Sequence, residues 1–245
     1  MIRGLQQSVV DGLPSIFAAW EGRRLPFMYT DSKGIVTCCT GNALFTAAAA
    51  DSLAWCRPDG TPCTKAEVDQ AYAVVKAAYP GVQSTACARL TTIRLTAASM
   101  TALIDRTIAQ DWVVLLSQLP GCDLWPADGQ LMALSSSWAW GAGFCSVWDR
   151  ISQSVPAEAG EFVPQPGFGY GAKFKELVSA PPQFVLAAQV MRAVSAHEEK
   201  INPGIVPRDL AEVVMLQNVA AVAAAGDDYS KLWYPAEYSA APDVA

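Results

Sequence analysis

The sequence predicts an α+β fold that is mainly helical, with one small antiparallel sheet near the N-terminus. Most of the chain repeats apolar residues at helical spacing. Residues 27–42 differ: short runs of Tyr, Thr, Val and Ile are separated by the turn sequence Asp31-Ser32-Lys33-Gly34, which is typical of a hairpin or a three-stranded sheet. Hydrophobic residues make up 52% of the chain and charged residues 16%, so a substantial core is available.

Apolar periodicity and end signals set the expected helices. The first covers residues 8–20, where Val9, Leu13 and Ile16 share one face, and Gly22 ends it. Thr64 and Glu67 form a capping box, so a helix begins there and closes before Pro80-Gly81. Further helices are expected over residues 43–55, 96–119, 130–140, 182–197 and 207–225. The segment 130–140 is apolar nearly all round and should be buried, whereas residues 155–171 predict a loop.

The length of 245 residues fits one sizeable domain. We expect a single domain over residues 1–245, with a small β subregion at about 25–42, a helical body at about 43–226 and an irregular tail at 227–245. Residues 1–20 lack the continuous apolar stretch of a secretory signal. The most apolar late run, 213–225, is too short to span a bilayer. The expectation is a soluble chain made in the cytoplasm without a signal peptide or a membrane span.

Charge and cysteine usage narrow the function classes. A formal net charge of −6 disfavours a nucleic-acid binder, which normally carries a basic patch. With one His and no CxxC pair, a zinc site is poorly supported, and no metal or cofactor is expected. The chain contains seven Cys, an odd number, so at least one of them is free or bonded to another chain. Cys56 and Cys63 flank the turn at 58–62 and either form a disulfide in an oxidising compartment or remain buried thiols.

Three polar residues form the most informative pattern. Glu21 ends an apolar helix, Asp31 opens the hairpin turn ten residues later, and Thr37 follows six residues further on. Glycoside hydrolysis needs one protonated carboxyl for the leaving oxygen and a second group that manages the incoming water. An apolar helix end favours a protonated Glu, and a polar turn favours an ionised Asp. On spacing alone, the alternative is a helix terminus followed by an ordinary turn-forming Asp.

The string Glu-Gly-(few)-Tyr-x-Asp-x-x-Gly-x-x-Thr resembles the catalytic signature of glycoside hydrolase family 24, the phage-type lysozymes or endolysins. The resemblance implies a lysozyme-like fold. It also implies a muramidase that hydrolyses the β-1,4 bond between N-acetylmuramic acid and N-acetylglucosamine in peptidoglycan. Glu21 would be the general acid, and Asp31 and Thr37 would hold the attacking water. If the reaction inverts the anomeric centre, the two carboxyls should lie roughly 6.5–9.5 Å apart.

Two later segments resemble the same family in the same order. Residues 130–141 resemble its buried helix, which ends in an aromatic-rich turn, and residues 204–212 resemble its Gly-Leu-Val-x-Arg-Arg-x-x-Glu stretch. The second match implies that Arg208 supports Glu21; the alternative is an ordinary first-turn helix residue. The candidate substrate-binding residues are Tyr29, Asn42, Trp138 and Trp140. For the two Trp the alternative is the hydrophobic core.

The chain departs from the family pattern directly after Thr37. The family continues Thr-Val/Ile-Gly-x-Gly-His, whereas this chain reads Thr37-Cys38-Cys39-Thr40-Gly41-Asn42. Cys39 therefore stands where Gly is expected and Asn42 where His is expected. A Gly at that position allows a positive φ or a close backbone approach, so Cys39 should need a local adjustment of the strand.

The expected partner is bacterial peptidoglycan, reached in the periplasm or cell wall after delivery by other machinery. If the chain is an antibacterial effector, an immunity protein is a further expected partner. The alternatives are a lytic transglycosylase and a non-catalytic peptidoglycan-binding or structural module. A Cys/His hydrolase would have to combine His197 with Cys38 or Cys39. His197 lies in a charged helix end, however, where we expect a solvated side chain.

Overall fold

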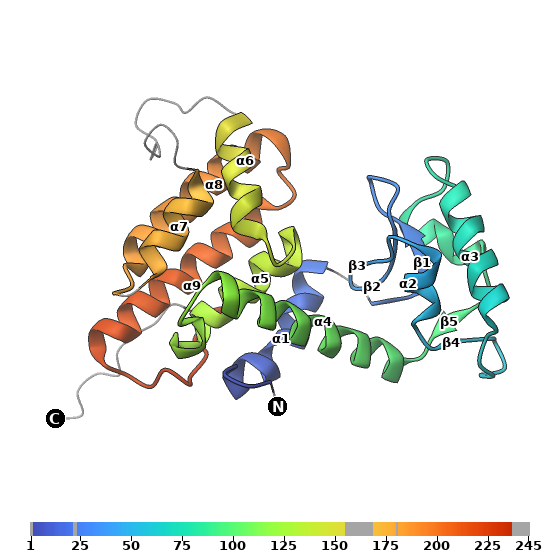
Figure 1. Cartoon of the computed structure of the whole chain (residues 1–245), viewed down its shortest axis with the longest axis horizontal. Coiled ribbons are helices and arrows are strands. Elements are labelled where there is room, and N and C mark those ends of the chain that lie inside the picture. The colour runs from blue at the N-terminus through green and yellow to red at the C-terminus, as the bar shows by residue number, and fades with distance from the viewer. Residues whose placement is uncertain (1, 22–23, 155–168, 180, 237–245) are drawn as a thin grey trace. The chain divides into compact units, whose positions relative to one another are not determined.

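The computed structural model describes residues 2–21, 24–154, 169–179 and 181–236, which form an α+β fold that is mainly helical (Figure 1). The chain divides into two compact units. The small unit is residues 15–107, and the larger unit is residues 1–14 and 108–245. Helices α1 (Gln7–Glu21) and α4 (Ala97–Gln118) contribute residues to both. Each follows its predicted bounds closely, although Gly22, the expected helix stop, lies outside the described residues.

The predicted antiparallel sheet lies in the small unit, and its prediction is confirmed. Its strand order is β1 (Leu25–Thr30), β2 (Val36–Cys39) and β3 (Asn42–Ala43). One face of the sheet carries Met28, Thr30, Val36, Cys38, Asn42 and Leu44, all of them buried. Because side chains alternate along a strand, Tyr29 and Thr37 point to the other face, where they are directly opposite each other. On this second face Tyr29 is partly exposed, whereas Thr37 is buried.

The expected helix at 43–55 is wrong for most of its length. Only α2 (Ala47–Asp51) is helical, and it begins at Thr46, whose side chain accepts a hydrogen bond from the Ala49 N–H. Trp55 instead belongs to a second sheet, in which β4 (Trp55–Cys56) pairs with β5 (Arg94–Leu95). Apolar periodicity over so short a run does not separate a helix from buried strand residues. The unit also contains α3 (Lys65–Ala77) and the 3-10 helix η1 (Ser84–Arg89).

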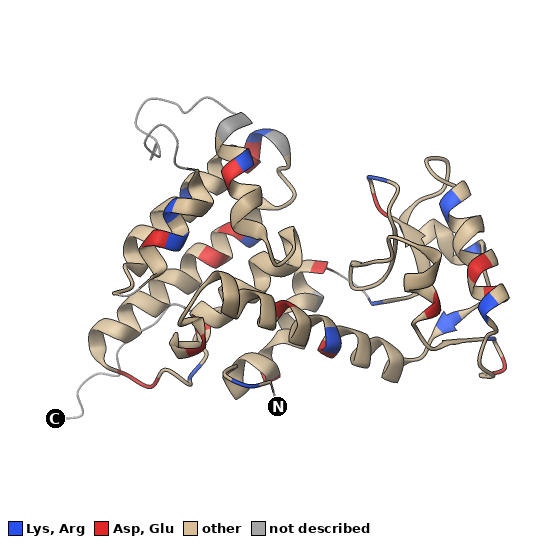
Figure 2. Ribbon diagram, viewed as in Figure 1, with Lys and Arg blue, Asp and Glu red and all other residues tan. Residues whose placement is uncertain are grey.

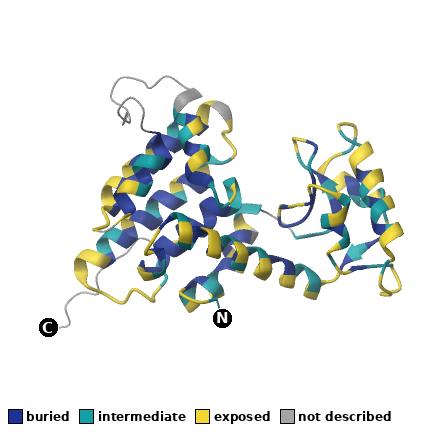
Figure 3. Ribbon diagram, in the orientation of Figure 1, coloured by how far each residue is buried: buried dark blue, intermediate teal, exposed yellow. Residues whose placement is uncertain are grey.

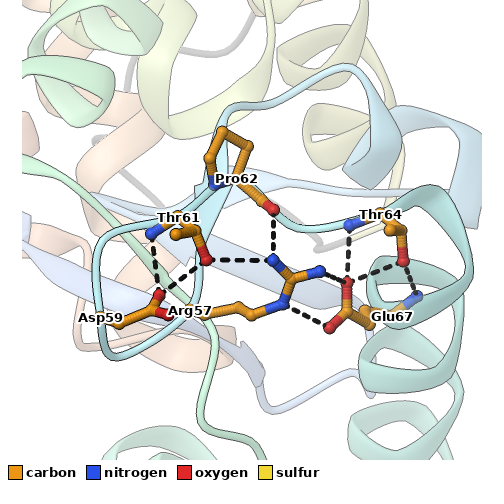
Figure 4. Close-up of polar contacts among 6 residues, drawn as sticks. All are labelled: Arg57, Asp59, Thr61, Pro62, Thr64 and Glu67. Atoms are coloured by element: carbon orange, nitrogen blue, oxygen red, sulfur yellow. Dashed lines mark hydrogen bonds and ion pairs between the residues drawn. The ribbon is translucent and has the colours of Figure 1, made fainter.

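A hydrogen-bonded loop joins β4 to α3, and Figure 4 shows its polar contacts. The Arg57 guanidinium donates to both carboxylate oxygens of Glu67, each at 2.7 Å, and also to the Thr61 hydroxyl and the Pro62 carbonyl. Glu67 in turn caps α3 through Thr64, which confirms the predicted capping box. The neighbouring Cys56 and Cys63 both carry free thiols.

The larger unit is a helical bundle that includes α5 (Ala127–Trp140), whose residues 127–137 are all buried (Figure 3). The prediction of a buried segment is thus confirmed for residues 130–137, whereas residues 138–140 are partly exposed. The bundle also contains the 3-10 helix η2 (Cys122–Leu124), α6 (Phe144–Ser154), α7 (Tyr170–Val178), α8 (Phe184–Ile201) and α9 (Val206–Ala225). Helices α8 and α9 confirm the predictions. Of the expected loop, residues 155–168 lie outside the described residues. No helix in the described part is long and apolar enough to cross a membrane.

Helices α6 and α7 were not predicted, and Gly171 explains how they pack. Tyr170 and Gly171, expected in a loop, begin α7. A Cβ atom on Gly171 would lie 1.8 Å from the backbone oxygen of Cys145 in α6. Glycine is therefore required for this close helix crossing, and the glycine-rich sequence that suggested a loop instead marks a packing contact.

Candidate functional site

In the turn between β1 and β2, the side chains of Asp31 and Thr37 are both hydrogen-bonded to the backbone of Ile35. Asp31 Oδ1 accepts hydrogen bonds from the backbone N–H groups of Lys33 at 2.9 Å and Ile35 at 2.8 Å. Thr37 Oγ1 donates to the Ile35 carbonyl at 3.1 Å, and the Asp31 N–H donates to the same carbonyl at 3.0 Å. Within the part of the chain that the structure describes, Asp31 Oδ2 has no hydrogen-bond partner.

Tyr29 connects this turn to Glu21. Its Cα is directly opposite that of Thr37, and Glu21 is the half-buried last residue of α1. Burial raises the pKa of the Tyr29 phenol to about 12; a hydrogen bond with the Gly41 backbone opposes the rise, and neighbouring ionisable groups, Glu21 among them, add to it. Glu21, Tyr29, Asp31 and Thr37 all belong to the small unit.

Cys39 has a left-handed backbone, with φ of 55°. A positive φ is a conformation that favours glycine, so Cys39 adopts a backbone that few other residue types take up. Burial raises the pKa of the Cys38 thiol to about 12 and also raises that of Cys39. Because the thiolate is the reactive form of cysteine, these surroundings disfavour either thiol as a nucleophile.

Asn42 is buried and faces α4. Its Nδ2 donates to Thr107 Oγ1 at 3.1 Å, whereas its Oδ1 is buried without a hydrogen-bond partner among the described residues. The Asn42 amide is thus held by a hydroxyl from α4. This contact fixes the strand β3 against α4 within the small unit.

The other predicted site residues belong to the larger unit. Trp138 and Trp140 lie in the last turn of α5, where both are partly exposed. Arg208 is buried in the first turn of α9, where its charge lowers the pKa values of Asp209 and Glu212 against the effect of burial. Glu21, Tyr29, Asp31, Thr37 and Asn42 thus all belong to the small unit; the register brings Tyr29 opposite Thr37, whereas Asn42 lies on the other face of the sheet. A role for Arg208 beside Glu21 stays a prediction.

His197 corrects an expectation. It is only 1% exposed, and its Nε2 lies 2.8 Å from the Tyr170 hydroxyl. The solvated helix end that we expected is wrong because α8 continues to Ile201, so its inner face still carries His197 into the bundle. The residue packs against α7, and the Cys38 and Cys39 thiols belong to the small unit.

Four carboxyl groups that sequence reasoning did not single out lie buried in the larger unit: Asp128 on α5, Glu198 on α8, and Asp209 and Glu212 on α9. Burial raises the pKa of Asp209 to about 8, and the charges of Glu212 and Glu198 add to the rise. Burial raises the pKa of Glu212 to about 7 although Ser135 and Ser136 donate hydrogen bonds to it. Among the described residues, no cluster of His, Cys, Asp and Glu could hold a metal ion.

Sequence reasoning also missed Arg24, which lies three positions after Glu21 at the start of the sheet. The sequence feature that could have identified it is a cation between Glu21, the candidate acid, and the strand that carries Tyr29.

A groove of about 600 Å³ lies on α8 and α9 of the larger unit; its lining residues include Arg192 and Gln217 but no predicted site residue. Comparisons with protein-family models, curated proteins and solved structures found no match to this chain.

Proposed function

We propose that this chain is a peptidoglycan muramidase that hydrolyses the β-1,4 bond between N-acetylmuramic acid and N-acetylglucosamine. The observation that carries the proposal is the turn in which Asp31 and Thr37 are both hydrogen-bonded to Ile35, with Tyr29 opposite Thr37 on β1 and Glu21 at the end of α1 in the same unit. Two carboxyl groups in different settings, one ending a helix and one in a polar turn, suit divided acid and base roles. Action in bacterial cell-wall lysis, as an endolysin or a secreted antibacterial effector, belongs to the proposal.

The hydrogen bonds of the turn suggest how water would be held. The Thr37 hydroxyl hydrogen is committed to the Ile35 carbonyl, so its oxygen can only accept. Asp31 Oδ2 is a second acceptor. A water that donates to both keeps a lone pair for the anomeric carbon. Glu21 would then protonate the glycosidic oxygen as the C–O bond breaks, and the proton of the attacking water would pass to Asp31.

The test is digestion of purified sacculi, with mass spectrometry of the soluble products. The wild-type chain should release fragments with reducing N-acetylmuramic acid ends. Glu21→Gln keeps the shape and removes the proton, so it should lower the rate by about 10²- to 10⁴-fold. Glu199→Gln, a change of an exposed carboxylate on α8, is the matched control and should retain activity.

The products separate the alternatives. Fragments ending in 1,6-anhydro sugars would replace hydrolysis by lytic transglycosylation, and peptide fragments would indicate an amidase or peptidase. Sacculi that bind the wild-type chain but stay intact would favour a binding module. Full activity in Glu21→Gln would remove Glu21 from the mechanism.

A further inference from the structure

We propose that Arg24 binds a carboxylate carried by the muramyl side group of the glycan, and that this contact makes the site prefer muramyl strands to neutral ones. The inference rests on the proposed function and extends it to a specificity-determining residue. The carboxylate can be the lactyl acid of peptide-free strands or a carboxyl of the stem peptide on intact strands. Both present the same planar anion to a guanidinium.

The position of Arg24 follows from the register of the sheet. Arg24 directly precedes Leu25, whose Cα pairs with that of Cys39, whereas Tyr29 pairs with Thr37. Along β2 the two pairs are two residues apart, or about 7 Å. Arg24 lies one residue beyond the first pair and Asp31 two residues beyond the second, so the two residues lie at opposite ends of the sheet, roughly 15–20 Å apart. A carboxylate bound at Arg24 would therefore belong to a sugar some units along the strand from the reacting bond.

The hydrogen bonding of Arg24 leaves room for an anion. Its Nη1 donates to the hydroxyl of Thr101 at 3.2 Å, and its charge also lowers the pKa of the Cys39 thiol. Thr101 is a neutral acceptor, and among the described residues no carboxylate forms an ion pair with Arg24. A guanidinium has five N–H donors, and Thr101 uses only one. By contrast, Glu67 already holds Arg57 through two hydrogen bonds.

The difference in net charge between the two units supports anion binding by the small unit. The small unit contains nine Lys and Arg against seven Asp and Glu, whereas the larger unit contains eight against sixteen. Figure 2 shows the Lys and Arg of the small unit on its helices, strands and loops. The net charge of −6 thus arises in the larger unit. The small unit is slightly positive, and an anionic strand would be attracted to it.

The experiment measures binding in the Glu21→Gln background, so that it does not depend on turnover. Co-sedimentation compares E21Q with E21Q/R24Q on native sacculi, on peptide-free strands and on sacculi whose carboxyls have been converted to amides with a carbodiimide. We expect R24Q to weaken binding to a native substrate by about tenfold or more, since a lost charge-assisted hydrogen bond is at least of that size. On amidated sacculi the two variants should bind equally.

Two further variants guard against a structural explanation. R24K keeps the charge without the planar fork and should restore part of the affinity. R89Q removes an exposed cation from η1 of the same unit and should stay within about twofold of E21Q. A loss that appears on peptide-free strands assigns the anion to the lactyl acid. A loss on intact sacculi alone assigns it to the stem peptide.

The proposal is overturned if R24Q binds native sacculi as tightly as E21Q does, or if it loses the same affinity on amidated sacculi. The result also stays separate from the proposed function. Carboxylate-dependent binding through Arg24, together with intact glycan after wild-type treatment, would retain the anion site and reject the muramidase. Hydrolysis that R24Q and amidation both leave unchanged would retain the muramidase and reject the anion site.

Discussion

In the small unit, three acidic side chains lie near the surface and pair with cations, whereas in the larger unit four carboxyl groups, Asp128 among them, lie in the core. Glu67 pairs with Arg57 at 2.7 Å, and Lys65 pairs with Asp51 and Asp69. In the larger unit Glu198, Asp209 and Glu212 are each at most 1% exposed. Surface pairs contribute little to stability, but a buried charge is costly unless it is neutralised or fully hydrogen-bonded. The core of the larger unit therefore carries the greater sensitivity to protonation.

The two arrangements give opposite pH dependences. Hydrogen bonds from Arg57 and Thr64 lower the pKa of Glu67 to about 2, so its contribution is present above pH 4.5 and is lost as the pH falls toward 2. Burial raises the pKa values of Asp209 and Glu212 to about 8 and about 7. Their folded forms hold protons that the unfolded chain releases, so stability falls as the pH rises from about 4 toward 8.

The largest expected effect comes from Asp209→Asn. Both oxygens of the Asp209 carboxyl are buried without a hydrogen-bond partner in the described part of the chain. An amide has the same shape and cannot ionise, so this substitution should stabilise the chain at pH 8–9 by several kcal/mol, on the order of the cost of the raised pKa. It should have a much smaller effect near pH 4. Thermal unfolding of the full chain between pH 4 and 9 measures the difference.

Glu199→Gln, an exposed change on α8, is the control and should leave the pH profile unaltered. If the wild-type chain and Asp209→Asn lose stability in parallel above pH 6, Asp209 does not hold a proton in the folded state. The contrast between the two units would then lose its main support.

A smaller effect is expected from Ser136→Ala, which changes the hydrogen bonding of a buried acid without changing its charge. The Ser136 hydroxyl donates to Glu212 Oε2 at 2.6 Å. Its removal leaves a fully buried oxygen without that donor and should cost about 1–3 kcal/mol of unfolding free energy at neutral pH. Urea unfolding at pH 7 and pH 5 tests this, because protonation of Glu212 at the lower pH should reduce the loss.

Ser146→Ala, at an exposed position on α6, is the matched change and should alter the unfolding free energy by less than about 0.5 kcal/mol. Equal stabilities for Ser136→Ala and the wild-type chain at both pH values would show that the buried acid does not depend on this donor.

The features that were predicted best from the sequence are those that depend on neighbouring residues. The capping box of Thr64 and Glu67 and the turn at Asp31 depend on residues within a few positions, so their chemistry is readable from the sequence alone. At Cys39 only a local adjustment of the strand was expected, and the structure shows it as a positive φ. Of these features, the turn at Asp31 belongs to the candidate site.

Features that depend on distant partners were missed. Gly171 suggested a loop, but its role is to let α7 approach the backbone of Cys145. His197 is buried against Tyr170, a hydrogen-bond partner that lies 27 residues away in sequence. The net charge of the whole chain concealed a small unit that is slightly positive, because the division between the units depends on contacts and not on sequence order.

The smallest expected effect is that of Arg57→Gln, which tests the contribution of the exposed ion pair between Arg57 and Glu67 in the small unit. Glu67 would lose the two guanidinium bonds but keep those from the Thr64 N–H and hydroxyl, so α3 should remain capped. The expected result is a small fall in Tm at pH 7 that shrinks in high salt and disappears near pH 2, where Glu67 is protonated. Hydrogen exchange at the Thr61 and Cys63 amides should increase, because the loop that Arg57 holds would open more often. Arg89→Gln is the control for loss of a cation. A fall in Tm larger than that of Ser136→Ala would mean that the exposed pair outweighs the buried acid, which would reverse the order of the two units.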